Sequence, residues 1–298
     1  MIKDNYKFTI INLLLVTTCL GTVDISGATD SRLETADFDN YNYMLHGAEI
    51  DIKYTYADER GDRLITFVQI PYSPHYKTDM FLYHYGDAYL IVKGSLEHPN
   101  IKIGRFDIPF GLLKTFDPHF SLMPQIFERS LGIKKDIGAE VFGYYKMLTY
   151  DISFTQGYNS FENPRNDMPI TLRLGLDNEL IKCGISYYNS THSMGDMPKM
   201  KKVGVDIEKN INPFIIRGEG IIGENPNGKG FSLIVDFPFF LGMQGSGSSL
   251  FWKEEISYQT YGLELKKDIS FLTIGAGLVT EKESDAKTKA IFQTIIKL

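Results

Sequence analysis

Basic and acidic side chains gather around a long polar connection, residues 112–134, that separates two apolar segments. The charged side chains of the connection and the residues just after it are Lys114, Asp117, His119, Glu128, Arg129, Lys134, Lys135, Asp136 and Glu140. Charges of both signs on one segment attract hydrated ions and polar solutes. No nucleophile beside a base is recognisable, and the six histidines show no metal-ligand spacing. The stretch predicts either a constriction that contacts hydrated solutes or a solvated loop whose charges pair with one another.

Strands with a two-residue period must position these charges. Residues 170–176 alternate Ile or Leu with Thr171, Arg173 and Gly175, and residues 181–187 repeat the alternation after a short turn. This pattern predicts a hairpin with one apolar and one polar face. The same period recurs in residues 203–207, 216–222, 231–237, 261–265, 272–278 and 290–298.

The alternation fits both a membrane β-barrel and a soluble β protein, and the lengths of strands and connections separate the two. The expected strands are about 9 to 12 residues long, which is the length that a tilted membrane strand requires. Short turns, such as residues 177–178 and 210–212, alternate with longer polar loops, such as residues 157–167 and 189–199. Bacterial outer-membrane barrels have this asymmetry. We therefore predict an all-β, transmembrane antiparallel barrel.

The length of the chain sets the size of that barrel and identifies its inward side chains. At about 18 to 20 residues per strand and connection, the chain gives about 14 strands, with 12 or 16 as alternatives. A barrel of this size encloses water. The candidates for pore-lining or constriction residues are Lys102, Arg105, Lys114, Arg129, Lys134, Lys135, Asp136, Glu140, Arg173, Arg217 and Glu219. Asp151, Asp206 and Glu264 are further acidic candidates, so both signs line the predicted bore, and we expect weak selectivity.

The N-terminus predicts export. Two lysines precede the apolar residues 8–20, and the small residues Ser26, Gly27 and Ala28 follow, so residues 1–28 read as a cleaved signal peptide. Lipidation at Cys19 is an alternative with a poor sequence match. Residues 29–298 then form one barrel domain in the bacterial outer membrane. Within it, the acidic residues 29–40 read as a tail before the first strand, and residues 242–249 read as a flexible loop.

Three short motifs follow one another at close spacing around the long connection. They are Gly104-Arg105-Phe106-Asp107-Ile108-Pro109-Phe110-Gly111, then Glu128-Arg129-Ser130, then Lys135-Asp136-Ile137-Gly138. The shift of the apolar residues between Ile103 and Phe106 predicts a β-bulge at Gly104-Arg105. Over about 45 residues the motifs resemble the phosphate-selective porin family of outer-membrane channels. That resemblance implies a porin-type barrel, but the ladder of arginines on which phosphate selectivity depends in the family cannot be aligned here.

Other functions have weaker support. The net charge of -6 argues against nucleic acid as a partner. A lipid hydrolase would need a Ser and a His on the lipid-facing side, and Thr155-Gln156-Gly157 and the pair Ser190 and His192 are its only hints. An adhesion or structural barrel would need a prominent outer loop. The sequence predicts no enzyme, no cofactor and no metal, with outer-membrane lipid and small hydrophilic solutes or ions as partners and a homotrimer as one possible assembly.

Overall fold

The computed structural model describes residues 21–36, 40–59, 61–72, 86–94, 98–114, 122, 135–157, 168–190, 200–224, 228–253, 257–282 and 286–297. Within these residues, sixteen strands and two short 3-10 helices follow one another along the chain. No helix among them is long and apolar enough to cross a membrane. The strands are β1 (Thr22–Ala36), β2 (Asn40–Asp58), β3 (Gly61–Tyr72), β4 (Ala88–Val92), β5 (Asn100–Asp107), β6 (Lys135–Tyr145), β7 (Leu148–Thr155), β8 (Ile170–Asp177), β9 (Ile181–Asn189), β10 (Lys201–Ile211), β11 (Phe214–Glu224), β12 (Gly228–Phe239), β13 (Met243–Lys253), β14 (Ser257–Ile269), β15 (Leu272–Lys282) and β16 (Ala286–Lys297); the helices are η1 (Gly111–Lys114) and η2 (Phe240–Gly242).

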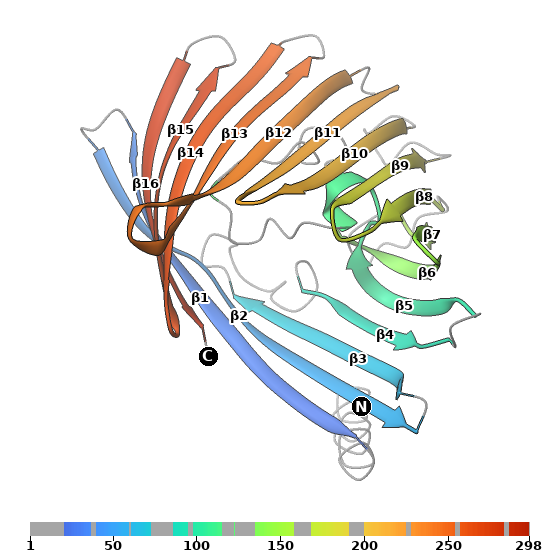
Figure 1. Cartoon of the computed structure of the whole chain (residues 1–298). Coiled ribbons are helices and arrows are strands. Elements are labelled where there is room, and N and C mark those ends of the chain that lie inside the picture. The colour runs from blue at the N-terminus through green and yellow to red at the C-terminus, as the bar shows by residue number, and fades with distance from the viewer. Residues whose placement is uncertain are drawn as a thin grey trace, which may run out of the picture.

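Each strand pairs antiparallel with its neighbours in the sequence, and β1 pairs with β16 to close the barrel (Figure 1). The closing register runs from Ala28 opposite Lys297 to Ala36 opposite Lys289. A closed sheet has no unpaired edge, so its backbone groups are satisfied without water, as a membrane-spanning sheet requires. The predicted all-β antiparallel barrel is confirmed. Its sixteen strands lie at the upper limit of the predicted range, and residues 22–36, which the sequence did not suggest as strand, form β1.

Long and short connections lie at opposite ends of the barrel. Four connections at one end span 15, 27, 14 and 11 residues, after β3, β5, β7 and β9 respectively. The opposite end carries two-residue turns such as the one between Tyr145 and Leu148, together with the start of β1 and the end of β16. We call these the loop end and the turn end. In outer-membrane barrels the short turns face the periplasm and the long loops face outward.

Apolar side chains cover the outside of the barrel, and polar ones face inward. On β8, the exposed fraction of Leu174 is 69%, whereas that of its neighbour Arg173 is 3%. This is the reverse of a soluble protein, where apolar side chains are buried. Large exposed aromatic side chains surround the turn end, as interfacial girdles do; among them are Tyr145, Phe214, Phe239, Phe240 and Phe271. The exterior therefore matches a lipid environment, and the soluble alternative is wrong.

Three local expectations from the sequence are corrected by the strands. Residues 29–36, expected as a tail, belong to β1, and residues 243–249, expected as a loop, belong to β13. Strand β5 pairs with both neighbours without a register shift, so the bulge predicted at Gly104-Arg105 is absent there, although Gly104 has φ +131. Strand β5 instead keeps its two-residue alternation, and along the strand the side chains that face inward change from polar to apolar.

The predicted signal peptide overlaps the barrel. Strand β1 begins at Thr22, so cleavage after Ala28 would remove the first seven residues of that strand. These seven residues pair with β2, from Thr22 opposite Thr55 to Ala28 opposite Glu49. The apolar segment on which the export prediction rests, residues 8–20, lies outside the described residues. Export therefore stays a prediction.

Candidate functional site

The chain enters the barrel directly after β5. Phe110 is fully buried in an apolar cluster inside the loop end, together with Ile108, Tyr188, Ile221 and Trp252. The next residues form η1, which lies inside the ring of strands against β9, β10 and β11 (Figure 1). The segment therefore passes over the inner faces of β6, β7 and β8 before it meets the wall again. The alternating pattern of apolar and polar residues did not predict this inward apolar cluster.

Two backbone hydrogen bonds hold η1 on the wall. The amide of Gly111 donates to Oγ of Ser186 at 3.0 Å, and the amide of Leu112 donates to Oε1 of Glu219 at 3.3 Å. Gly111 has φ +57, and a Cβ at this position would lie 1.6 Å from Oε1 of Glu219. Only glycine allows both the backbone conformation and this close approach. The Phe110-Gly111 pair of the sequence motif is therefore the point where the segment is anchored.

Leu122 brings the same segment to a third part of the wall. Its side chain is buried against Val279 on β15 and Ile291 on β16. A Cβ built on Gly277, which faces inward on β15, would lie 3.0 Å from Cδ1 of Leu122. Because β9 to β11 and β15 to β16 occupy separate positions around the ring, the described residues of this connection meet the inner wall at two separate places. Protein atoms inside the bore narrow the aqueous path.

A buried charge cluster, Arg173, Asp206 and Glu219, lies beneath η1. Nη2 of Arg173 donates to Oδ1 of Asp206 at 2.7 Å, and both side chains are almost fully buried. Asp206 stands directly opposite Glu219 in the register of β10 and β11. Gly184 makes room for the cluster, because a Cβ there would lie 2.5 Å from Nη2 of Arg173. Burial of charges is tolerated only where they are paired, so this cluster is a rigid base for η1.

A second set of charges forms a ladder across five strands nearer the turn end. Nζ of Lys182 lies 3.4 Å from Glu208, and Nε of Arg217 lies 2.7 Å from the same carboxylate. Arg217 also pairs with Asp236, which accepts a hydrogen bond of 2.7 Å from Oγ of Ser246. All five side chains point inward from successive strands, β9 to β13. The ladder places both signs side by side along the bore.

Lys102 occupies a third inward site, on β5. Its Nζ lies 2.5 Å from Oε2 of Glu140 and 5.0 to 5.5 Å from the ring centroids of Tyr89, Phe106 and Phe142. Three ring faces and one carboxylate hold the ammonium in place. Pairing of Lys102 with Glu140 could not be read from the sequence, because 38 residues separate them.

The predicted site residues therefore divide into groups. Lys102, Glu140, Arg173, Arg217 and Glu219 point into the barrel, but the first four form ion pairs and Glu219 holds η1. Arg105 and Asp136 are buried, and Asp136 accepts hydrogen bonds from the amides of Ile137 and Gly157. Lys135 pairs with Asp87 and Asp107. The structure describes Lys114 only as backbone of η1, and Arg129 and Lys134 lie outside the described residues.

Sequence reasoning missed a buried polar group on the strand that closes the barrel. Asp30 accepts hydrogen bonds from Arg32, at 2.8 and 3.1 Å, and from Nε2 of Gln293, at 3.0 Å. Asp30 and Arg32 were overlooked because residues 29–40 read as a polar tail. Their spacing of two residues was the available signal.

The comparison with solved structures gives the class of barrel. The anion-selective porin from Comamonas acidovorans superposes with a TM-score of 0.74, at 8% identity, over 93% of this chain and 100% of that one. The trimer form of OmpT, an outer membrane protein of Vibrio cholerae, gives 0.72 at 10% identity over 94% and 100%, and OmpF of Salmonella typhi in complex with daunomycin gives 0.69 at 12% identity over 93% and 98%. The fold is that of the outer-membrane porins. No family model and no curated protein matches the sequence.

The comparison with solved structures supports a broader class of proteins than the resemblance seen in the sequence does. The neighbours include an anion-selective porin and OmpF, so they support a porin-type barrel in general. They do not single out the phosphate-selective family. The porin-type part of the prediction is confirmed, and the narrower family stays a prediction.

Proposed function

We propose that the protein is an outer-membrane porin that allows passive, weakly selective diffusion of small hydrophilic solutes or ions. One observation carries the proposal: Phe110, Gly111 and Leu122 lie against the inner wall of a closed barrel whose exterior is apolar. A barrel of sixteen strands leaves an aqueous channel, and protein segments inside it limit the size of the solutes that pass.

The inward charges support weak selectivity. Arg173, Lys102 and Arg217 are each paired with a carboxylate, so no unbroken row of one sign follows the bore in the described residues. On β2, Glu49 and Asp51 are half-buried and Lys53 is exposed, so both signs also face the more accessible part of the interior. Mixed charge favours small differences between cations and anions. We propose no specificity for phosphate.

The proposal contains no enzymatic step. Ser190, one of the hints of a lipid hydrolase, is buried, and its backbone amide donates to the carbonyl of Met200. A hydrolase acting on lipid needs an accessible nucleophile on the outward face, with a base beside it. A homotrimer remains part of the proposal, supported by the trimer form named for the Vibrio cholerae protein.

Conductance of the refolded chain in planar bilayers tests the function. We expect stepwise, ohmic conductance that rises with KCl concentration, and a small reversal potential in a KCl gradient. Liposome swelling with sugars of increasing size should then give a sharp upper limit. Heat-denatured protein is the control. Heat-modifiable, correctly inserted protein that conducts no ions and passes no sugar would overturn the proposal.

A further inference from the structure

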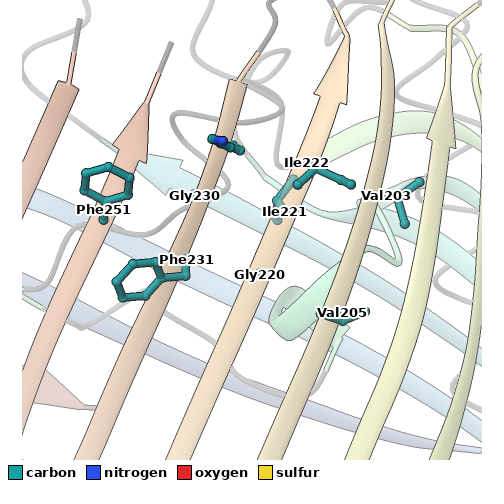
Figure 2. Close-up of a pocket in the computed structure, with 9 residues that line it drawn as sticks. Val203, Val205, Gly220, Ile221, Ile222, Gly230, Phe231 and Phe251 are labelled. Carbon is teal, nitrogen blue, oxygen red and sulfur yellow. The ribbon is translucent and has the colours of Figure 1, made fainter.

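A groove runs along the lipid-facing side of β8 to β12. It consists of two hollows of about 730 and 380 Å³, which share Val205, Gly220 and Phe231 in their walls. Figure 2 shows Phe231 and Phe251 on one side of the smaller hollow and Val203, Val205 and Ile222 toward the other. Almost all lining side chains are apolar.

Glycines of β11 form the floor of the groove. Gly218 and Gly220 alternate with the inward residues Arg217 and Glu219, so the two glycines lie at outward-facing positions of the strand. A Cβ at Gly220 would lie 3.6 Å from Cγ2 of Val205, and one at Gly218 would lie 3.4 Å from Cγ2 of Ile207. These are ordinary contact distances, so the backbone would accept side chains here. The groove exists because Gly218 and Gly220 have no side chains, whereas the outward positions of the neighbouring strands carry large ones.

Lysines mark the loop end of this groove. Lys229 lines the smaller hollow, and Lys253 is its direct partner across β12 and β13. Both side chains are exposed, and each lies two residues along its strand from an outward phenylalanine, Phe231 or Phe251. Lys201 stands at the same end of β10. The backbone of each lysine therefore lies about 7 Å, two strand residues, beyond that of the outward phenylalanine on the same strand.

Two lysines directly opposite each other on a sheet repel and destabilise the pair. Within the described part of the chain, neither Lys229 nor Lys253 forms an ion pair with a carboxylate. At the rim of a membrane-spanning barrel, the phosphate of a lipid head group is an anion that can stabilise such a pair. The loop end, with the long connections, is the end that faces the outer leaflet.

We propose that this face binds an outer-leaflet lipid whose phosphate-bearing head group has a net negative charge, with the phosphate between Lys229 and Lys253 and one acyl chain in the groove over Gly218 and Gly220. An unbranched acyl chain fits a long, narrow apolar groove, and the lysines lie where its head group emerges. The site is independent of conduction through the bore.

Native mass spectrometry of the full, delipidated chain in neutral detergent tests the proposal. The probes are palmitoyl-oleoyl phosphatidylglycerol, phosphatidylcholine with the same chains, and inorganic phosphate. We expect phosphatidylglycerol to bind at least about tenfold more tightly than phosphatidylcholine, and inorganic phosphate to compete weakly because it has no acyl chain. Equal binding of the two lipids, or equal competition by inorganic phosphate, would overturn the site.

Matched variants separate the head-group site from the groove. The double variant Lys229→Gln and Lys253→Gln should remove the preference for phosphatidylglycerol. Its control, Lys209→Gln with Lys282→Gln, removes the same charge from exposed positions on β10 and β15 and should keep the preference. Unchanged preference in the first double variant would contradict the proposal.

The groove has its own control. Gly220→Leu should weaken both lipids severalfold, whereas Gly247→Leu, on β13 with nothing within 4 Å of its Cβ, should leave binding unchanged. Heat-modifiable migration reports folding of each variant, and the comparison of probes on the wild-type chain stands without any variant. If a second copy of the chain occupied the groove instead, Gly220→Leu would change the oligomeric mass and leave lipid binding unaffected, which would also overturn the proposal.

Discussion

The inner wall beneath η1 differs from the inner wall of β2 and β3. Beneath η1, Ser186 is fully buried and accepts a hydrogen bond from the amide of Gly111, and Asp151 and Arg173 on β7 and β8 beside it are almost fully buried. We call this part of the interior the covered wall. On β2, the inward Glu49 and Asp51 are only half-buried. The same strand pattern therefore serves two purposes. Glu219 on the covered wall accepts a hydrogen bond from η1, and the charges on the more open wall are the ones that we propose a passing ion meets.

Among the changes that test this difference between the two walls, removal of the Arg173 guanidinium beneath η1 should have the largest effect. Arg173→Leu leaves Asp206 and Glu219 buried without their cation, and breaking such a pair costs about 3 to 5 kcal/mol. We expect a lower urea midpoint for unfolding from lipid vesicles, together with larger and noisier conductance because η1 loses its base. Lys182→Gln, described below, is the control. A quiet channel of wild-type size would show that the covered wall does not position the segment.

Gly111→Ala should act more locally. The new Cβ would clash with Oε1 of Glu219, and φ +57 is unfavourable for alanine by about 1 kcal/mol. We expect near-normal folding but a displaced η1, seen as a changed single-channel conductance and a changed sugar size limit. The matched control is Gly61→Ala, which also has positive φ but has nothing within 4 Å of its Cβ and lies at the turn end. Equal conductance changes in both variants would mean that backbone strain alone explains the result.

Charge removal on the open wall should change selectivity rather than stability. The double variant Glu49→Gln and Asp51→Asn should move the reversal potential in a KCl gradient toward anion preference, because two accessible negative charges are lost. Asp151→Asn removes a charge from the covered wall and should leave the reversal potential unchanged. If Asp151→Asn gave the larger shift, the assignment of the two walls would be reversed.

The smallest effect is expected at the end of the ion-pair ladder. The side chain of Lys182 is 38% exposed and lies 3.4 Å from Glu208, so Lys182→Gln should change the free energy of unfolding by only about 0.5 kcal/mol. Arg217→Gln, in the middle of the ladder, should cost more, because it leaves both Glu208 and Asp236 without their main partner. If urea unfolding showed that Lys182→Gln and Arg217→Gln lower the free energy of unfolding equally, the ladder would not be cooperative.

Two misread segments show where local patterns are insufficient. Residues 242–249 contain three glycines and four polar residues, which are poor strand formers, yet residues 243–249 lie in β13 between two long partners. The ring of Phe237 lies 2.4 Å from the position of a Cβ on Gly245, so the aromatic side chain covers the glycine. Residues 29–36 form strand because they pair with β16 and so close the barrel. In both cases pairing between strands overrode the local preference.

The two-residue period of the sequence determined the strands, the apolar exterior and the polar interior, and the alternating lengths of the connections determined the asymmetry between the two ends of the barrel. The first three features are local, since successive side chains of a strand point to opposite faces whatever the rest of the chain does. Only the tertiary structure decided that sixteen strands close the ring, that Leu112 meets a carboxylate 107 residues away, and that Lys102, Arg173 and Arg217 each pair with a carboxylate. Those contacts depend on the register of all strands and on where η1 meets the inner wall, and no local pattern encodes either.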